Sequence, residues 1–360
     1  MSDRHGTVPL PVERLHLELT NICNFSCEFC PDAVMTRPKG MMQPELAKAV
    51  LDAAARTGAV RTMHFHVMGE PTLHPKLVDI VTYAAERGLK TCLTTNGSRL
   101  DERLLRELDR AGLDDIIVSL QTPDERTFRI RASKAVAFGD YADRITEACR
   151  MFLDDKGRTT MTVSFLSSPL RRLIIPIFPE VSIADTSADL KHYLRTWTAR
   201  ILSGTAVENR SADVVKQIQK IRSFRENTIR LADRLSFHTR VMGDWAVHFQ
   251  RKNVDAAFGY CPALRENFGI LWNGEYTFCC TDYDGQTSAG NFRDMGLLDY
   301  LGSDAVRKVV GGFDRYRVTH PYCKQCLGDR TLLNAGVKQV GSIVYFKLLR
   351  KRFAKLGGRR

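Results

Sequence analysis

The cysteine residues are grouped in a way that indicates cluster or metal chemistry. The chain has ten cysteines, and Cys23, Cys27 and Cys30 stand in a C-x3-C-x2-C pattern. Thiolates are the preferred ligands of iron–sulfur clusters, and three close thiolates can hold three corners of a [4Fe–4S] cube. One iron is then left open for another ligand. A structural zinc site normally has four ligands, and no fourth ligand is close in this sequence.

A second group of cysteines lies in the C-terminal third of the chain. Cys261, Cys279 and Cys280 precede a C-x2-C pair formed by Cys323 and Cys326. Hairpin turns can bring Cys261 and Cys279 beside that pair, which gives four thiolates around one metal or cluster. Neighbouring strand residues point to opposite faces, so Cys279 and Cys280 cannot both be ligands. Zinc stays the chief alternative here, because four thiolates also suit a structural zinc site.

The elements that must position these cysteines follow a βα pattern. Short apolar, β-rich segments alternate with amphipathic helical segments, which predicts a parallel sheet. The expected strands cover residues 14–20, 60–67, 89–95, 114–120, 159–165 and 235–241. The expected helices cover residues 43–57, 75–88, 101–112, 188–203 and 211–233. Six such strands indicate an α/β protein with a partial (β/α)6 TIM-like barrel, whose active site lies at the C-terminal ends of the strands.

The first cysteine motif directly follows the first expected strand. With Phe29 before its last cysteine, it resembles the signature of the radical S-adenosylmethionine (SAM) superfamily. HVMGEPTLHP at 66–75 resembles the Gly-Gly-Glu segment of that family, although Met68 stands where the first Gly is usual. TTNG at 94–97 and VSLQTPDERTFRIRAS at 118–133 resemble family segments around the SAM nucleoside.

The resemblance implies a set of cofactor contacts and a reaction. Gly69 and Glu70 are expected at the methionine amino group of SAM and Ser119 at its ribose. Phe29 and Asn96 complete the expected SAM-binding residues. A [4Fe–4S] cluster on the first three cysteines would bind SAM and cleave it reductively to a 5′-deoxyadenosyl radical, which abstracts hydrogen from an unactivated carbon. A cellular reductant such as flavodoxin or ferredoxin is the expected electron donor.

The C-terminal cysteine region resembles the SPASM/Twitch extensions of the same superfamily. The matching features are a cysteine before Pro262, the turn from Gly274 to Cys279, the Gly290–Asn291 pair and the final C-x2-C. Full SPASM domains have further cysteines for a second auxiliary cluster, and this chain has none after residue 326. The resemblance therefore implies one auxiliary [4Fe–4S] cluster, held by Cys261, Cys279, Cys323 and Cys326. This cluster would accept the electron left on the substrate after hydrogen abstraction. A structural role, or a role in passing electrons to the first cluster, is also open.

The expected domain organisation follows from where the βα alternation stops. It comprises an N-terminal extension (1–12), a partial barrel (13–250, with an expanded crossover at 167–233), a small α+β cluster-binding domain (251–335) and a basic amphipathic helix or tail (336–360). The net charge is +12, of which residues 330–360 carry +9 and the remaining residues +3. Because the basicity is confined to a tail, no nucleic-acid partner is expected.

The tail itself is expected to form a helix with one apolar stripe. Phe346, Leu349, Phe353 and Leu356 fall on one side, with Lys and Arg around them. Packing on the small domain is the favoured interpretation, and weak contact with an anionic membrane surface is the alternative. The chain has no export signal and no apolar run of membrane-spanning length, which favours a cytoplasmic protein.

Other polar residues receive structural interpretations. His64 and His66 share one strand face, and they and His74 are expected in strand packing or at the surface rather than in a metal site. Asp282 is interpreted as a turn aspartate. Arg131 is interpreted as a solvated helix arginine.

The leading functional hypothesis is a radical SAM oxidoreductase. Its expected substrate is a small molecule, such as a polyol or sugar, or a peptide. Only about a dozen residues precede the expected barrel, so no separate leader-peptide-binding domain is expected, although another protein could supply recognition. A peptide-modifying maturase that forms crosslinks or epimerises residues is the alternative. A non-catalytic iron–sulfur or zinc protein that binds nucleic acid through its tail is the alternative from a different class.

Overall fold

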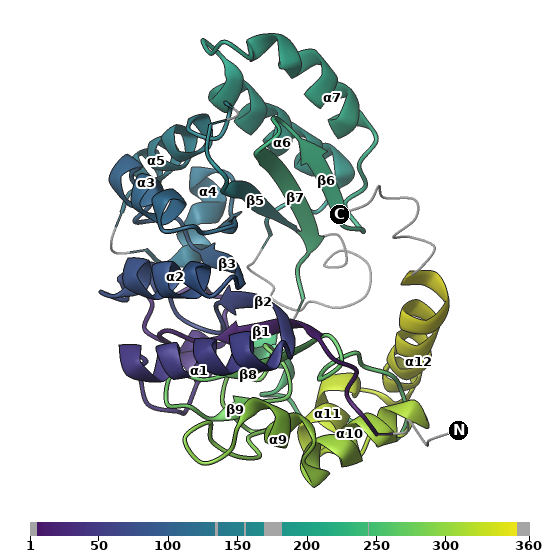
Figure 1. Cartoon of the computed structure of the whole chain (residues 1–360). Coiled ribbons are helices and arrows are strands. Elements are labelled where there is room, and N and C mark those ends of the chain that lie inside the picture. Colours follow the sequence, from purple (N-terminus) through teal and green to yellow (C-terminus); the bar gives the residue numbers. More distant parts are fainter. Residues whose placement is uncertain (1–5, 134–135, 155, 169–181, 244, 351–360) are drawn as a thin grey trace. The chain divides into compact units, whose positions relative to one another are not determined.

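The computed structural model describes residues 6–133, 136–154, 156–168, 182–243 and 245–350 (Figure 1). The chain divides into two compact units. We call Thr20–Val34 with Met68–Asp244 the loop unit, because it contains the first cysteine motif. We call Met1–Leu19, Met35–Val67 and Trp245–Arg360 the terminal unit, because it contains both ends of the chain.

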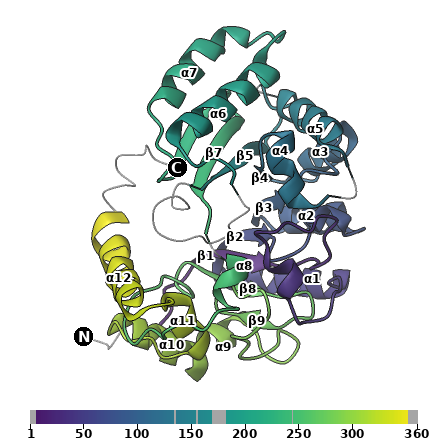
Figure 2. The ribbon, with the colours of Figure 1, turned by 180° about the vertical axis from the view of Figure 1, so that it is seen from behind.

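The loop unit is a parallel sheet with helices. Strands β3 (Lys90–Thr95), β4 (Asp115–Gln121), β5 (Thr160–Ser167) and β7 (Leu235–Val241) pair in parallel in that order. Strand β6 (Asn227–Arg230) adds to β7 in antiparallel orientation. The helices are α2 (Leu77–Glu86), α3 (Glu102–Arg110), α4 (Glu125–Phe128), α5 (Phe138–Arg150), α6 (Ser187–Leu202) and α7 (Ser211–Gln219). Helices α6 and α7 lie side by side (Figure 2).

Strand β4 of the loop unit has one buried apolar face and one partly buried, more polar face. On β4, Ile116, Val118 and Leu120 are buried, whereas the alternate residues are only partly buried. The partly buried residue Ser119 belongs to the second face, which on β5 carries Thr162. Alternate side chains of a strand point to opposite faces, so these two hydroxyl groups lie on the less buried side of the two strands.

The terminal unit contains a second group of strands. Strands β2 (Val60–Phe65), β1 (Val12–Leu17) and β8 (Asn267–Ile270) are parallel, and β9 (Tyr276–Thr277) pairs antiparallel to β8. The helices are α1 (Pro44–Thr57), α8 (Trp245–His248), α9 (Leu297–Leu301), α10 (Asp304–Asp314), α11 (Pro321–Leu327) and α12 (Leu332–Ile343). Helix α12 continues as a π-helix over Val344–Leu349.

Local sequence explains where the clearest helix begins and ends. Pro44 occupies the first turn of α1, where its missing N–H is not needed. Gly58 ends the helix in the left-handed conformation, with φ of 58°, which glycine adopts without steric cost. Between them Leu46, Val50 and Leu51 are buried on one side.

The expected fold class is confirmed. The chain is α/β, its main strands are parallel, and the six expected strands form within a few residues of their expected bounds. The expected helix over 211–233 is wrong beyond Gln219, because residues Asn227–Arg230 form β6 instead. Ile229 pairs opposite Phe237, and both side chains are fully buried, so cross-strand packing outweighs local helical preference.

The domain boundaries and parts of two expected segments stay predictions. The proposed domain boundaries stay a prediction. The Pro-rich part of the expected crossover (169–181) lies outside the described residues, as do Phe353 and Leu356 of the tail. Among the described residues, no helix combines the length and apolarity needed to cross a lipid bilayer.

Candidate functional site

Cys23, Cys27 and Cys30 lie together in the segment Thr20–Val34, which we call the cysteine loop. Burial raises the pKa of Cys23 to about 11 and that of Cys30 to about 12, and it raises the pKa of Cys27 as well. The three thiols are close enough to influence one another electrostatically. Without a cation the thiols are therefore protonated, and iron must displace their protons to bind.

Backbone hydrogen bonds hold this cysteine loop to the rest of the loop unit. The amides of Ser26 and Glu28 donate to the carbonyl oxygens of Arg131 and Ile130, at 3.1 and 3.0 Å. The amide of Glu70 donates to the carbonyl oxygen of Ile22 at 2.8 Å. The loop is thus fixed just before its first cysteine and on both sides of its second.

Arg131 is buried against the cysteine loop, so its interpretation as a solvated helix arginine is wrong. Its side chain is 2% exposed. The guanidinium Nη1 donates to the carbonyl oxygens of Ser119 at 2.5 Å and Leu120 at 2.6 Å. It lies 4.6 Å from the ring centre of Phe25, and its charge and a hydrogen bond oppose the rise in the pKa of Cys27 that burial causes.

The local backbone explains why Arg131 is buried. Helix α4 ends at Phe128, and residues Arg129–Arg131 form a 3₁₀ turn that ends at Ala132 with φ of 42°. The tighter turn directs Arg131 inward, while Arg129 stays exposed. A buried guanidinium favours the thiolate form of its neighbour, which is the form that binds iron. In the described part of the chain, its Nε has no hydrogen-bond partner.

Glu70 braces the turn that follows β2. Its carboxylate is 1% exposed, and Oε1 accepts from the amide and hydroxyl of Thr72 and from the hydroxyl of Thr95. Oε2 accepts from the amide of Asn96 at 2.6 Å. Four donors thus occupy the carboxylate, and its expected contact with the SAM amino group stays a prediction.

Gly69 lies where a side chain cannot fit. Its φ is 73°, and a Cβ would lie 2.5 Å from the carbonyl oxygen of Thr20 and 2.8 Å from the Cα of Asn21. These distances are far below van der Waals contact. The glycine of the expected Gly-Glu segment is therefore required by the close approach of the cysteine loop.

Asn96 links the cysteine loop to the end of β3. Its Nδ2 donates to Oδ1 of Asn24 at 2.8 Å and lies 3.8 Å from Sγ of Cys23. Asn24 in turn donates to the hydroxyl of Ser98 at 2.9 Å, and the hydroxyl of Tyr141 donates to the carbonyl oxygen of Asn96 at 2.7 Å. The expected SAM-binding residue is therefore within reach of the first cysteine.

The other two expected SAM contacts also lie in the loop unit. Phe29 is partly buried and packs on a small apolar cluster of Ile130, Leu166 and Ile183. Ser119 lies on the polar face of β4, where its carbonyl oxygen binds Arg131. Their contacts with SAM stay predictions.

The second set of cysteines comes together in the terminal unit. Cys323 and Cys326 lie on α11, Cys279 follows β9, and Cys261 precedes β8. Burial raises the pKa of Cys279 to about 12 and raises the pKa values of Cys261 and Cys323 further. Cys279 and Cys326 contribute electrostatically to the rise at both of these thiols. Among the described residues, no three His, Cys, Asp or Glu side chains converge tightly enough to bind a single metal ion.

Aromatic side chains and a turn support this second set. The hydroxyl of Tyr322 and the indole N–H of Trp245 both donate to the carbonyl oxygen of Thr281, at 2.7 and 2.8 Å. Asp282 is fully buried and accepts from the amide and hydroxyl of Thr287, both at 2.7 Å. Its interpretation as a turn aspartate is confirmed.

Gly274 and the Gly290–Asn291 pair of the C-terminal region lie beside one another. Gly274 has φ of 93°, and a Cβ there would lie 2.6 Å from Oδ1 of Asn291. The amide of Phe292 donates to the carbonyl oxygen of Gly274, and the amide of Tyr276 donates to that of Gly290. The Gly290–Asn291 pair therefore closes the turn that leads into Cys279.

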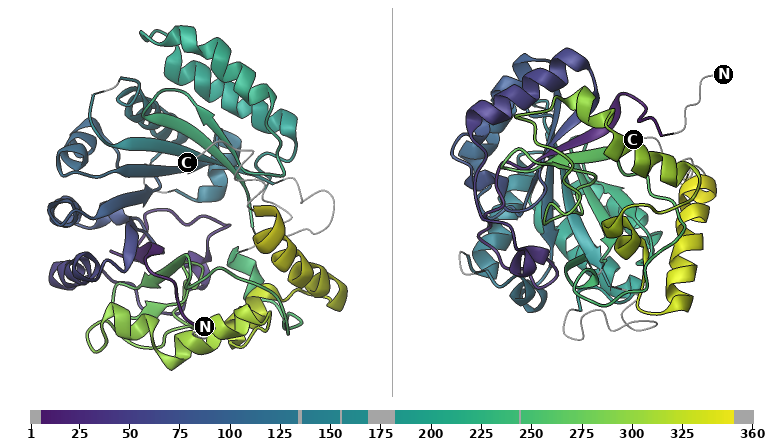
Figure 3. Two further views of the ribbon diagram at one scale, coloured as in Figure 1. Left: turned by 45° about the vertical axis from the view of Figure 1, so that its right-hand side comes forward. Right: turned by 90° about the horizontal axis from the view of Figure 1, so that it is seen from below.

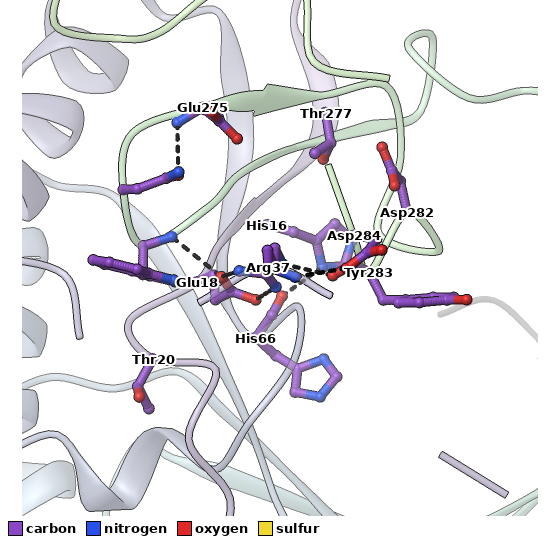
Figure 4. A network of polar contacts seen from close by, with 12 residues as sticks. His16, Glu18, Thr20, Arg37, His66, Glu275, Thr277, Asp282, Tyr283 and Asp284 are labelled. Atoms are coloured by element: carbon purple, nitrogen blue, oxygen red, sulfur yellow. Dashed lines mark hydrogen bonds and ion pairs between the residues drawn. The ribbon is translucent and has the colours of Figure 1, made fainter. Parts of the chain in front are cut away.

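A buried ion pair in the terminal unit was not expected from the sequence (Figure 4). Glu18 is fully buried and accepts from both Nη atoms of Arg37, at 2.6 and 2.5 Å. The amide of Arg37 donates to Asp284, and its Nε donates to the carbonyl oxygen of Tyr283. The amide and hydroxyl of Thr36 also donate to Asp284, both at 2.7 Å. The segment after the cysteine loop is thus fixed to the turn after Cys279.

The polar face of β1 and β2 carries a buried histidine, His16, and a partly buried one, His64. His16 pairs with His64 across the strands, and their ring centres are 5.2 Å apart. Burial lowers the pKa of His16 to about 4 and that of His64 to about 3. The expectation of strand packing is therefore correct for His64. Both imidazoles are neutral near pH 7 and can serve as hydrogen-bonding groups rather than as charges.

Family models match two parts of the chain. Residues 17–166 match the radical SAM superfamily, and residues 261–327 match SPASM, an iron–sulfur cluster-binding domain. The first match contains the cysteine loop, Glu70, Asn96 and Arg131. The second contains all four expected auxiliary ligands. The two groups of partly buried cysteines thus lie one in each match.

Individual relatives match over smaller shares. A tungsten-containing aldehyde ferredoxin oxidoreductase cofactor-modifying protein of Pyrococcus furiosus is 34% identical over 29% of this chain and 30% of its own length. A PqqA peptide cyclase of Gluconobacter oxydans is 39% identical over 33% of each chain. The chain thus spans about a third of the length of these relatives.

Among solved structures, Streptococcus suis SuiB bound to the precursor peptide SuiA has a TM-score of 0.54 and 15% identity. That similarity covers 85% of this chain and 68% of SuiB. At this level of identity the similarity concerns the fold.

Proposed function

We propose that this chain abstracts hydrogen from a peptide and oxidises that peptide by two electrons. The chain belongs to the radical SAM superfamily and carries a SPASM iron–sulfur cluster-binding domain. The observation that carries the proposal is the combination of the anchored cysteine loop with a second set of four cysteines in the terminal unit. When bound, SAM and a reduced [4Fe–4S] cluster supply a 5′-deoxyadenosyl radical, and an auxiliary cluster supplies an electron acceptor. Binding of the cofactor and of the two clusters depends on side chains of the protein.

The loop unit is proposed to hold SAM and the first cluster. Cys23, Cys27 and Cys30 are the ligands, and Arg131 stabilises the thiolate form of Cys27. Glu70 maintains the turn after β2, and Asn96 lies beside Cys23. Two further roles rest on the family resemblance alone: Ser119 binds the ribose, and Phe29 packs against the cofactor.

The terminal unit is proposed to hold the auxiliary cluster. Cys279 is the proposed ligand rather than Cys280, because neighbouring strand residues point to opposite faces and the turn from Gly274 favours Cys279. Cys279 and Cys326 both contribute electrostatically to the raised pKa values of Cys261 and Cys323. This proximity supports one shared cluster for the four cysteines.

The peptide substrate is proposed from the relatives. One is named a PqqA peptide cyclase, and the SuiB structure contains a precursor peptide. The reaction balances if one substrate C–H bond gives its hydrogen atom to the radical. The substrate then loses one further electron and a proton, so that it has lost two hydrogen atoms when the new bond forms. This balance holds for a crosslink and for a simple dehydrogenation.

A small polyhydroxylated molecule is the second candidate. The polar strand faces favour it, because they carry hydroxyl and imidazole groups that can bind the hydroxyl groups of such a molecule. His16 and His64 are such groups in the terminal unit, and Ser119 and Thr162 are such groups in the loop unit. Neutral hydroxyl and imidazole groups match sugar hydroxyls as well as peptide amides.

The first experiment tests the reaction class. The chain is reconstituted with iron and sulfide without oxygen, then incubated with SAM and dithionite, and 5′-deoxyadenosine is measured by liquid chromatography. We expect 5′-deoxyadenosine and about eight irons per chain, as two [4Fe–4S] clusters require. Zinc in place of iron, or no cleavage of SAM by iron-loaded protein, would refute the proposal.

The second experiment separates the two substrate classes. Short peptides encoded beside the gene and a panel of polyols and amino sugars are each added to the reconstituted protein. Mass spectrometry then reports a loss of two hydrogen atoms, in step with 5′-deoxyadenosine formed. Oxidation of the sugars and of none of the peptides would replace the peptide assignment with the second candidate.

A further inference from the structure

Helices α10 and α11 and the segment between them are rich in Lys and Arg. Residues 305–328 contain five of these cations and a single acid, Asp314. The carboxylate of Asp314 is bound by the guanidinium of Arg265 at 2.5 Å, and Arg307 lies 3.9 Å from Asp304. Four further side chains have no ion pair and no hydrogen bond in the described part of the chain, namely Lys308, Arg315, Arg317 and Lys324.

These four cations lie on neighbouring segments of the terminal unit. The hydroxyl of Thr319 donates to the carbonyl oxygen of Lys308 at 3.3 Å, so the segment before α11 contacts α10. The amide of Ala256 donates to the carbonyl oxygen of Lys324 at 2.9 Å. Figure 3 shows residues 304–327, in yellow-green, grouped within the terminal unit. Positive charge is therefore concentrated in one part of this unit.

Two exposed aromatic rings accompany the cations. Phe258 and Tyr316 are each 41% exposed. Phe258 forms an antiparallel β-bridge with Arg317, and the side chains of such directly paired residues lie on the same side. The amide of Gly259 donates to the carbonyl oxygen of Tyr316 at 3.0 Å, beside the same bridge. We call the four unpaired cations and these two aromatic residues the basic patch.

The basic patch borders the second set of cysteines. Lys324 stands between Cys323 and Cys326 on α11. The ring of His320, in the same stretch of chain, lies 5.1 Å from that of Phe278, which directly precedes a third cysteine of the set. A protein that docks on the basic patch would therefore lie next to the proposed auxiliary cluster.

The proposed reaction requires an electron to leave this part of the chain. The substrate gives a hydrogen atom to the radical, a proton to solvent and one electron to the auxiliary cluster. That cluster can accept the next electron only after an external one-electron oxidant has taken the first.

We propose that the basic patch is the docking surface of an acidic one-electron carrier protein, of the flavodoxin or ferredoxin type, whose oxidised form takes this electron. The proposal rests on the function proposed above. Redox partners typically meet through small, transient interfaces, and opposite charges speed their association. Nucleic acid would also be attracted to cations and aromatic rings. An acidic carrier is favoured, because the patch borders cysteines that are proposed to hold a redox centre.

Binding of oxidised flavodoxin to the full, reconstituted chain tests the docking surface. Flavodoxin is immobilised, and binding is measured by biolayer interferometry without oxygen. We expect binding to weaken at least about tenfold between about 0.05 and about 0.5 M salt, because salt screens the charges. No binding, or binding that salt does not weaken, would overturn the proposal.

Matched charge variants locate the surface. The patch variant combines Lys308→Gln, Arg315→Gln and Arg317→Gln. The control removes the same number of exposed cations from α3 by Arg103→Gln, Arg106→Gln and Arg110→Gln. The patch variant should bind flavodoxin at least about tenfold more weakly than the control. Equal binding by the two variants would overturn the proposal. Both should retain their iron and cleave SAM with dithionite, a small reductant that needs no docking surface.

Stopped-flow absorbance tests the electron step itself. It uses Cys27→Ala, which should hold only the auxiliary cluster, and mixes the reduced protein with oxidised flavodoxin. Adding the three patch substitutions should lower the second-order rate constant at least about tenfold, whereas the α3 substitutions should leave it unchanged. Equal rate constants would overturn the proposal. Failure of the unaltered chain to cleave SAM with dithionite would instead refute the proposed function, so the two failures are distinguishable.

An uncharged variant and a competitor complete the test. Phe258→Ala removes one ring without changing charge, and it should weaken flavodoxin binding at least about threefold relative to Phe224→Ala, whose phenylalanine is 66% exposed in the loop unit. A single-stranded oligonucleotide of random sequence is the competitor. Tighter binding of the oligonucleotide than of flavodoxin, lost in the patch variant, would make nucleic acid the occupant and the proposal wrong.

Discussion

The two cysteine sites are built in different ways. The first takes its three thiols from one loop, Thr20–Val34, and the surrounding loop unit fixes that loop by backbone hydrogen bonds and Arg131. The second takes its thiols from three segments that lie between residues 261 and 326, and it forms only if the terminal unit folds. Local spacing therefore defines the first site, whereas tertiary structure defines the second. The following predictions test this contrast.

The largest effect is expected from separate removal of ligands at the two sites. Cys27→Ala should abolish 5′-deoxyadenosine formation and lower iron to about four per chain, because only the first cluster is lost. Cys323→Ala with Cys326→Ala should lower iron by a similar amount but leave SAM cleavage measurable. Iron analysis and chromatography of the reconstituted proteins provide both readouts.

Two cysteine controls accompany these variants. Cys280→Ala should retain both clusters, because Cys279 is the proposed ligand. Cys92→Ala removes a buried thiol of β3 that belongs to neither site. Loss of SAM cleavage in the Cys323/Cys326 variant would show that the two sites are not separable.

Arg37 should be the most important single side chain for the stability of the terminal unit. Arg37→Met leaves the carboxylate of Glu18 buried without its cation, which typically costs about 3–5 kcal/mol of unfolding free energy. Urea unfolding followed by tryptophan fluorescence measures the change. The exposed pair of Arg103 and Glu107 supplies the control, since Arg103→Met should change stability by less than about 1 kcal/mol. Equal effects of the two substitutions would contradict the role of the buried pair.

Arg131 should act on the first site alone. Arg131→Met leaves the carbonyl oxygens of Ser119 and Leu120 without their donor, at a cost of about 1–3 kcal/mol. It also removes the charge that favours the Cys27 thiolate, so iron should bind less tightly at the first site. Arg129→Met, on the exposed neighbour, should change neither property. An unaltered iron affinity in Arg131→Met would limit this arginine to a structural role.

The smallest expected effect is a pH dependence of the terminal unit. The pKa values of His16 and His64 are lowered in the folded protein to about 4 and about 3. The unfolded chain therefore binds protons below about pH 6.5 that the folded chain does not, and stability falls as the pH decreases. Each histidine contributes a slope of up to about 1.4 kcal/mol per pH unit between its unfolded and folded pKa values.

Comparison with a histidine variant isolates this contribution. Unfolding midpoints in urea at about pH 7 and about pH 5 should differ less for His64→Asn than for the unaltered chain. His192→Asn, at an exposed position of α6, should keep the full difference. If His64→Asn also kept it, the buried histidine pair would not be the cause.

The sequence predicted the fold class, because it depends on short patterns. The seven thiol ligands stay predictions from cysteine spacing and family resemblance. Strand alternation located six strands, and cysteine spacing identified the first site. Segment β6 was missed because its burial depends on its pairing with β7, which local periodicity does not contain.

The residues that support the sites were harder to predict. Arg131 is buried at the end of a 3₁₀ turn and donates to carbonyl oxygens of β4, and local sequence does not show these contacts. The contacts among Glu18, Arg37 and Asp284 join positions that are distant along the chain, so no spacing rule connects them. The tail helix is expected to pack on the small domain, and the ring of Phe346 lies 6.1 Å from that of Tyr260. The polar bonds of Gln339 and Ser342 to residues 257–260 join positions far apart along the chain, so no spacing rule predicts them.

The raised thiol pKa values also bear on how the chain behaves before iron arrives. A thiolate attacks disulfides and reacts with peroxide far faster than a thiol does, so a cysteine with a raised pKa is a weak target for oxidation. Cys23 and Cys30 in the loop unit and Cys279 in the terminal unit all have raised pKa values. We therefore expect slow disulfide formation at both sites in the iron-free chain. Iron must displace the protons of these thiols before they can act as ligands.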